Sequence, residues 1–175
     1  RVFASLIARR AGGEPVAYLL GRREFYGRDL LVDSCVLIPR PETEHLVEAV
    51  LEALPDSATR FADLGTGSGA LAVTLCCERP GWRGTALDLS PTALQRARDN
   101  AARHGVADQL ALVCADFCED LPVAGLDLLV ANPPYLSEEE WREISCEVRD
   151  FEPREALVAG ETGLEALASL LPRAW

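Results

Sequence analysis

The residues best suited to chemistry follow a hydrophobic run, residues 126–131, which ends in Asn132-Pro133-Pro134-Tyr135. Proline has no N–H and a fixed φ, so two consecutive prolines end a strand in a stiff loop. The Asn132 side-chain oxygen and the Pro133 carbonyl can accept both N–H bonds of a planar amine, which leaves its lone pair aimed at an electrophile. The loop therefore predicts chemistry on an amino nitrogen, with a simple strand-ending turn as the alternative.

A glycine-rich turn, Asp63-Leu64-Gly65-Thr66-Gly67-Ser68-Gly69, lies between a predicted strand and a predicted helix. Glycines permit positive φ and close approach of a ligand, and a helix N-terminus offers free N–H groups. The Gly-x-Gly-x-Gly spacing differs from the Gly-x-Gly-x-x-Gly of dinucleotide sites. Asp63 also places a negative charge where a pyrophosphate would lie, so the turn favours a cationic ligand over NAD.

Two further aspartates follow predicted strands. Asp88, next to Leu89, stands where an acidic residue accepts hydrogen bonds from ribose hydroxyls, with a helix-capping aspartate as the alternative. Asp116, followed by Phe117, suits an adenine ring, and a surface turn is the alternative. Ligands of open α/β sheets bind at the carboxyl ends of the strands. Three strand-end aspartates therefore indicate a nucleoside-containing ligand.

Strand and helix patterns alternate from residue 60 onward, which predicts an α/β fold: a Rossmann-like parallel sheet with helices on both faces. A β-hairpin precedes it. The predicted elements are a helix over 1–11, a connector over 14–21, a hairpin over 24–38, a helix from Pro41 to 54, strands over 61–64, 84–87, 110–115 and 126–131, helices over 70–78 and 91–104, a helix from the Ser137 capping box to 148, irregular chain over 151–162, and a helix from 163.

Composition restricts the class of protein. The chain has 175 residues, 49% of them hydrophobic, and a formal net charge of −11, which disfavours nucleic acid as the main partner. No apolar run is long enough for a membrane span, and no signal-peptide pattern is present. Six cysteines without a Cys-x-x-Cys spacing, beside two histidines, predict no metal site. We expect a cytoplasmic monomer whose cysteines are mostly small core residues.

Several segments together resemble the HemK/PrmC family of peptide chain release factor glutamine N5-methyltransferases, which are class I S-adenosylmethionine-dependent enzymes. The Asn-Pro-Pro-Tyr and glycine loops are shared with many amino-methyltransferases, whereas the segments at 39–44 and 152–157 are narrower signatures. The resembling segments are Gly13-Glu14-Pro15-Val16-Ala17-Tyr18, Glu24-Phe25-Tyr26-Gly27, Leu37-Ile38-Pro39-Arg40-Pro41-Glu42-Thr43-Glu44, Asp63 to Gly69, Asn132-Pro133-Pro134-Tyr135 and Glu152-Pro153-Arg154-Glu155-Ala156-Leu157.

The resemblance implies a role for each site residue. Strands 61–64 and 126–131 are expected to be neighbours, which puts Asn132 beside the glycine loop. The expected cofactor is S-adenosylmethionine. Its methionine part would contact Asp63, Gly65, Thr66, Gly67 and Gly69, and its methyl group would lie near Asn132. Its ribose would contact Asp88 and Leu89, and its adenine would contact Asp116 and Phe117. The expected catalytic residues are Asn132, Pro133 and Tyr135, and the expected substrate contacts are these three with Pro134, Pro39, Arg40 and Thr43; an ordinary surface arginine is the alternative for Arg40.

The implied substrate is the glutamine of the Gly-Gly-Gln motif in class 1 release factors. Residues 1–20 resemble the tail of an N-terminal helical domain that helps bind the release factor, 21–41 a hairpin linker, and 42–175 a catalytic domain whose last strands we expect to be missing. The first alternative is a nucleic-acid amino-methyltransferase acting on adenine N6 or guanine N2. The second is a cofactor-binding fragment without turnover, and a nicotinamide dehydrogenase is more distant.

Overall fold

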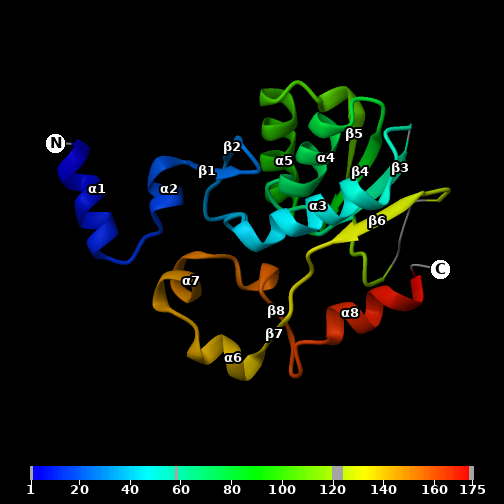
Figure 1. Ribbon diagram of the computed structural model, residues 1–175. Helices are drawn as coiled ribbons and strands as arrows, with labels where there is room; N and C mark the ends of the chain where they lie inside the picture. Colours follow the sequence, from blue (N-terminus) through cyan, green and yellow to red (C-terminus); the bar gives the residue numbers. More distant parts are fainter. Residues whose placement is uncertain (1, 58, 120–123, 174–175) are drawn as a thin grey trace.

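A parallel sheet forms the centre of the protein in the computed structural model, which describes residues 2–57, 59–119 and 124–173. Its strands are β3 (Arg60–Leu64), β4 (Arg83–Asp88), β5 (Leu110–Cys114) and β6 (Leu128–Ala131), in the order β5-β4-β3-β6 (Figure 1). Leu64 of β3 pairs with Ala131 of β6, so the glycine loop and Asn132 leave neighbouring strands at the same edge. This confirms the predicted fold class and the neighbouring strands.

Helices pack on both faces of this sheet, because successive strand residues point to opposite faces. Phe61 and Ala86 face α3 (Glu44–Ala53), α4 (Ala70–Glu78) and α5 (Pro91–Arg103) in one hydrophobic cluster. Ala62 and Leu87 face the other side, where Leu170 of α8 (Glu165–Leu170) packs against them. Pro41 opens a short 3-10 turn, Pro41–Thr43, that leads into α3, as the sequence predicted.

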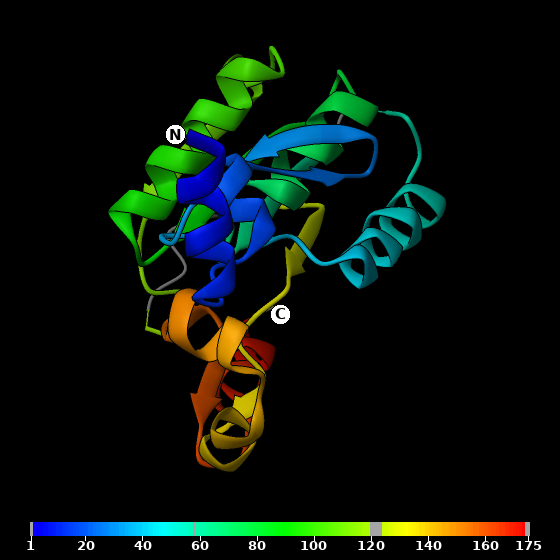
Figure 2. The same ribbon diagram turned by 90° about the vertical axis from the view of Figure 1, so that its left-hand side faces the viewer.

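The chain before the sheet contains α1 (Val2–Ala11), α2 (Val16–Leu20), β1 (Arg22–Phe25) and β2 (Arg28–Leu31), with β1 and β2 antiparallel (Figure 2). The prediction of a plain connector over 14–21 is wrong, because α2 forms there and buries Tyr18. The predicted hairpin over 24–38 is too long, since its strands end at Leu31. Residues 33–40 instead form a loop. The Tyr18 hydroxyl of α2 donates a 2.6 Å hydrogen bond to the Val36 carbonyl in this loop.

The chain after β6 forms a separate layer of short elements below the sheet (Figures 1 and 2). They are β7 (Leu136–Ser137), α6 (Glu138–Glu143), α7 (Cys146–Phe151), a 3-10 turn (Arg154–Ala156) and β8 (Val158–Gly160). The Ser137 and Glu140 capping box is present, but the single helix predicted to 148 is wrong, because Ile144 is extended between α6 and α7. The irregular chain predicted over 151–162 is also wrong, since β8 pairs with β7 in parallel.

The cysteines do not form part of the core as a group. Cys76 is buried, Cys35, Cys77 and Cys118 are half-buried, and Cys114 and Cys146 are exposed, so the prediction that most are core residues is wrong.

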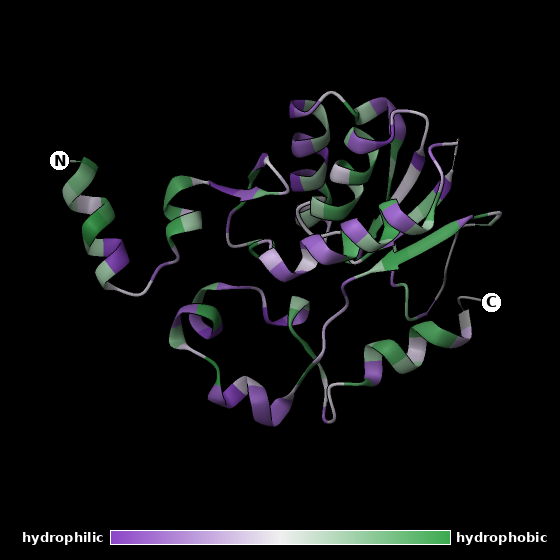
Figure 3. Cartoon of the chain, viewed as in Figure 1, coloured by the Kyte–Doolittle hydropathy of each residue, from purple (hydrophilic) through white to green (hydrophobic). Residues whose placement is uncertain are grey.

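Among the described residues, no helix has both the length and the apolar character needed to cross a bilayer. The hydrophilic α6 and the hydrophobic β6 are distinct in Figure 3. The predicted domain boundaries stay predictions; Arg1 and residues 174–175 lie outside the described residues.

Candidate functional site

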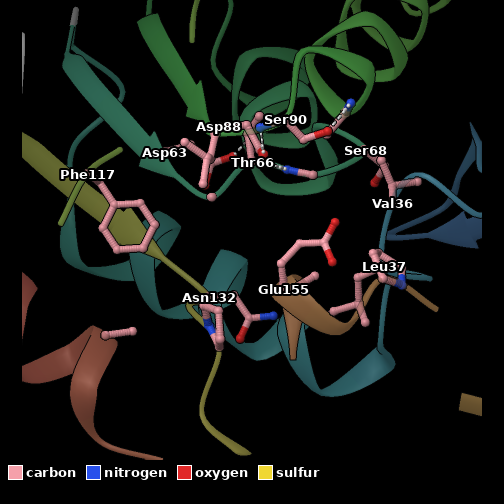
Figure 4. Close-up of a pocket in the computed structure, with 18 of the residues that line it drawn as sticks. Val36, Leu37, Asp63, Thr66, Ser68, Asp88, Ser90, Phe117, Asn132 and Glu155 are labelled. Carbon is pink, nitrogen blue, oxygen red and sulfur yellow. Dashed lines mark hydrogen bonds between the residues drawn. The ribbon is translucent and has the colours of Figure 1, made fainter. Parts of the chain in front are cut away.

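A cavity of about 700 Å³ lies between the carboxyl edge of the sheet, the 35–43 loop and the layer below the sheet (Figure 4). It is large enough for a drug-sized ligand, for which pockets span roughly 300–1,000 Å³. Sequence-predicted residues from the sheet edge, the 35–43 loop and the Asn-Pro-Pro-Tyr loop meet there. Those that line it are Pro39, Arg40, Thr43, Asp63, Gly65, Thr66, Gly67, Asp88, Leu89, Asp116, Phe117, Asn132 and Pro134.

Three predicted site residues do not line the cavity. Gly69 has φ +82°, and a Cβ there would lie 3.2 Å from Ala97, so this glycine lets the loop pack against α5. Pro133 is buried, and the Tyr135 side chain is 56% exposed. Their predicted roles toward ligands stay predictions, and the structure places Tyr135 beyond the cavity lining.

The glycine loop is held by two carboxylates, those of Asp63 and Asp88. Asp63 Oδ2 accepts hydrogen bonds from the Thr66 hydroxyl, at 2.7 Å, and from the Ala72 N–H, at 3.2 Å. Asp88 Oδ2 accepts a 2.8 Å bond from the Gly67 N–H, where φ is +54°. These hydrogen bonds fix the backbone that a ligand would meet. The loop can adopt this conformation because glycine tolerates a positive φ.

Asp63 is the most unusual charge in the cavity. It is 1% exposed, and its Oδ1 has no hydrogen-bond partner within the described residues. Burial, reinforced by the nearby Asp88 charge, raises the pKa of Asp63 to about 6. A buried carboxylate with a free oxygen is stabilised by a cation that takes that oxygen.

Asp88 makes a local turn contact and also lines the cavity. Its Oδ1 accepts a 2.9 Å bond from the Ser90 N–H, next to the start of α5, which is the local turn contact expected of a capping aspartate. The same side chain lines the cavity, and burial raises its pKa, with Glu155 adding repulsion. Asp116 is similar, since it lines the cavity while its Oδ1 accepts the Cys118 N–H at 2.8 Å.

Replacing Asp88 by alanine should weaken binding of a ribose-containing ligand by about 1–3 kcal/mol, the usual cost of stranding hydrogen-bond partners. The change also releases the Gly67 N–H. Isothermal titration calorimetry with S-adenosylhomocysteine measures the effect, and Asp88→Asn, which keeps one acceptor oxygen, should lose less. An unchanged dissociation constant for Asp88→Ala would show that Asp88 does not contact the ribose.

The Asn-Pro-Pro-Tyr loop is anchored through its backbone. The Leu157 carbonyl accepts hydrogen bonds from the N–H groups of Tyr135 and Leu136, at 3.1 and 2.9 Å. Gly163, with φ +80°, approaches so closely that a Cβ would lie 2.6 Å from the Tyr135 carbonyl oxygen. Within this loop the Asn132 side chain points into the cavity (Figure 4), and its Nδ2 donates a 3.3 Å bond to Thr43 Oγ1.

A buried glutamate holds the 35–43 loop in place. The Glu152 side chain, 1% exposed, pairs with Arg40 at 2.7 Å and also accepts the Ile38 N–H at 3.1 Å. Arg40 is therefore not an ordinary surface arginine, and its predicted contact with the substrate stays a prediction. Glu152 thus bonds two residues that lie more than 100 positions before it in the sequence, and it holds the loop that forms one wall of the cavity.

Replacing Glu152 by alanine should lower the free energy of unfolding by about 3 kcal/mol, because a buried ion pair loses one partner. Glu147→Ala is the matched control, since Glu147 pairs with Arg10 at the surface. Surface pairs contribute roughly 0–1 kcal/mol. Urea unfolding followed by circular dichroism measures both changes, and equally small effects would contradict a structural role for Glu152.

The sequence prediction missed cavity residues from the 152–157 segment. Pro153, Glu155 and Ala156 line the cavity, and the Glu155 carboxylate extends into it toward the glycine loop (Figure 4). The sequence motifs identify this segment as a signature confined to few families, which is a signal that it could shape the site. Other unpredicted lining residues are Phe25, Cys35, Val36, Leu37, Ser68, Ala70, Leu71, Ser90, Ala93, Cys118, Val158, Ala159, Glu165, Ala166 and Ser169.

The donor set fits a ligand that carries positive charge beside a nucleoside. Asp63, Asp88 and Glu155 give the cavity negative charge, the free Asp63 oxygen can accept a hydrogen bond, and Leu89 and Phe117 supply apolar surface. In the parts of the chain that the structure describes, no three His, Cys, Asp or Glu side chains are grouped to hold a metal ion.

Comparisons with known proteins match the chain to release factor glutamine methyltransferases. The sequence is 56% identical to a release factor glutamine methyltransferase of Nitratidesulfovibrio vulgaris, over 99% of this chain and 59% of that protein. It is 47% identical to one of Koribacter versatilis, over 97% of this chain and 60% of that protein. The chain thus spans about three fifths of the length of the curated relatives it matches.

A solved RNA methyltransferase from Salinibacter ruber, in complex with S-adenosyl-L-homocysteine, matches at 21% identity and a TM-score of 0.47, over 67% of this chain and 72% of that one. The sequence model of the methyltransferase small domain matches residues 43–149, which include the glycine loop and Asn132. The resemblance predicted from the sequence motifs is confirmed by these matches, and the chain belongs to the methyltransferase small domain family.

Proposed function

We propose that this protein transfers a methyl group from S-adenosylmethionine to the side-chain amide nitrogen, N5, of the glutamine in the Gly-Gly-Gln motif of class 1 peptide chain release factors. The proposal is supported by near full-length similarity of the chain to release factor glutamine methyltransferases. The single observation that carries it is the Asn132 amide, which points into the cavity from the strand next to the glycine loop.

The cofactor's part in the reaction is to supply an electrophilic methyl group on a sulfonium. Asp63 and the backbone of Gly65 and Gly67 would hold its charged end, because all three line the cavity and Asp63 keeps one oxygen without a hydrogen-bond partner among the described residues. Asp88 would accept the ribose hydroxyls, and Leu89 and Phe117 would contact the adenine ring. The acidic lining favours a cationic ligand electrostatically.

The substrate amide is a poor nucleophile because its nitrogen lone pair is delocalised. Asn132 Oδ1 and the Pro133 carbonyl would accept its two N–H bonds and turn the nitrogen toward the methyl group, which is catalysis by positioning. The nitrogen forms the new N–C bond as the S–C bond breaks, the electron pair stays on sulfur, and the nitrogen then gives a proton to water. A strong base is not needed, since the proton leaves from a cationic product.

Substrate class is tested by offering the protein radiolabelled S-adenosylmethionine with a class 1 release factor, tRNA, rRNA or DNA. We expect label on the release factor alone, and no label on a release factor whose Gly-Gly-Gln glutamine is replaced by alanine. Label on nucleic acid would favour the amino-methyltransferase alternative. Cofactor binding without transfer to any acceptor would favour a non-catalytic module, and tight binding of NAD would favour a dehydrogenase.

Location, assembly state and domain organisation are part of the same proposal. Release factors act on ribosomes, so we infer a cytoplasmic protein. We also propose that it is a monomer. We also infer that residues 1–20 belong to a helical substrate-binding region, 21–41 to a hairpin linker and 42–175 to the catalytic domain. Light scattering coupled to size-exclusion chromatography tests the monomer, and a mass of two chains would contradict it.

A further inference from the structure

Thr43 makes a contact that its position at a helix start does not explain. It lies where the 3-10 turn Pro41–Thr43 passes into α3, and threonine at a helix start commonly accepts a hydrogen bond from the helix backbone. The Thr43 side chain makes no such capping bond. Its Oγ1 instead accepts the Asn132 Nδ2–H at 3.3 Å, across 89 positions of sequence.

In this structure the Thr43 hydroxyl, which can donate as well as accept, acts as the acceptor for the nitrogen end of the Asn132 amide. With Nδ2 committed to Thr43, the Oδ1 atom has no protein donor among the described residues and is left for a ligand. An asparagine amide can be turned by 180° at small steric cost, because its oxygen and nitrogen ends have nearly the same shape. In the turned state Nδ2 would meet the N–H groups of the substrate, where two donors repel each other.

Thr43 is itself held firmly. Its N–H donates a 3.1 Å bond to the Arg40 carbonyl, and Arg40 pairs with the buried Glu152. Glu152 also accepts the Ile38 N–H, so the loop is fixed on both sides of Pro39. The threonine hydroxyl is therefore carried by a rigid segment, as a group that positions a reacting side chain requires.

We propose that Thr43 is a positioning residue: by accepting the Asn132 Nδ2–H, it holds the Asn132 oxygen toward the amide nitrogen to be methylated. This inference rests on the proposed function for its catalytic consequence, but the hydrogen bond itself can be tested without any activity. The competing role for Thr43 is direct contact with the substrate.

The hydrogen bond is tested by NMR of the protein labelled with ¹⁵N-asparagine. The sequence has two asparagines, so the spectrum holds two side-chain amides. Asn100, whose Nδ2 donates to the Leu31 and Ser68 carbonyls, serves as the internal reference. We expect Thr43→Val, which keeps the shape but removes the acceptor, to shift the Asn132 Nδ2 protons and leave Asn100 unchanged, and Thr43→Ser to resemble the wild type. An unchanged Asn132 signal in Thr43→Val would overturn the proposal.

The catalytic consequence is tested with release factor as acceptor. Thr43→Val should lower kcat about tenfold, as expected for the loss of a single hydrogen bond, and leave the KM for S-adenosylmethionine unchanged. Thr43→Ser should restore most of the rate. In an Asn132→Ala background, Thr43→Val should cause no further loss, because a positioning residue acts only through its partner.

The outcomes separate the two proposals. Equal losses from Thr43→Val with and without Asn132 would mean that Thr43 contacts the substrate itself, and would overturn the positioning role. A wild-type protein that transfers no methyl group to release factor would contradict the proposed function, while the NMR comparison would still decide the Thr43–Asn132 hydrogen bond.

Discussion

Replacing Asn132 by alanine should lower the rate of methyl transfer to a release factor by about 100-fold or more. The change removes one of two acceptors that orient the amide nitrogen, and misplacing a reacting atom by about 1 Å costs on the order of 100-fold. Asn132 lines the cavity just after the end of β6, beside the glycine loop that follows β3. Single-turnover rates, measured by mass spectrometry of the acceptor, give the size of the loss.

The same variant should bind S-adenosylhomocysteine within a few fold of the wild type, because most groups expected to hold the cofactor lie at the carboxyl ends of β3, β4 and β5 and in the loops that follow them. Calorimetry measures that affinity, and a thermal unfolding scan checks that the variant is folded. A variant that lost cofactor binding together with transfer would show that the Asn-Pro-Pro-Tyr loop is a structural support. A variant that kept its full rate would contradict the two-acceptor arrangement.

Replacing Asp63 by asparagine should weaken binding of S-adenosylmethionine by about 1.5–3 kcal/mol, the usual value of a hydrogen bond to a charged group. The wild-type affinity should rise with pH up to about 6 and then level off, because a cationic ligand needs the ionised carboxylate and burial raises the pKa of Asp63 to about 6. The asparagine variant should lose this part of the pH dependence. Calorimetry between pH 5 and 8 measures both effects.

Asp63 should act on stability in the opposite direction. Its pKa is higher in the folded chain than the ordinary 3.8, so its contribution is fully present below pH 3.8 and is lost as the pH rises to about 6. Each pKa unit corresponds to about 1.4 kcal/mol, which gives a loss of up to about 3 kcal/mol relative to Asp63→Asn. Urea unfolding without ligand at several pH values measures it. A constant difference between the two proteins across this range would contradict the raised pKa.

The central part of the fold and site could be predicted because local rules act there. Glycine spacing, proline positions and the alternation of strands and helices predicted the sheet, and parallel strands bring Asp63, Asp88 and Asn132 to one edge. Asp88 shows that both of its proposed roles can coexist, since it bonds the Ser90 N–H and also lines the cavity.

The remainder depends on contacts that no local pattern contains. The Tyr18 hydroxyl reaches Val36, and Glu152 reaches Ile38 and Arg40 more than 100 positions away. These contacts stabilise α2 and the 35–43 loop, where short-range patterns predicted a connector and a longer hairpin. The Thr43–Asn132 bond is of the same kind, because it joins a helix start to a strand end through tertiary packing.

The central claim is that the acceptor nitrogen is the N5 of a glutamine on a release factor. Tandem mass spectrometry of a class 1 release factor, incubated with this protein and S-adenosylmethionine, locates the added group directly. We predict a single methyl group on the side-chain amide of the Gly-Gly-Gln glutamine. A methyl group on another residue, or an unmodified release factor in the presence of bound cofactor, would contradict the account.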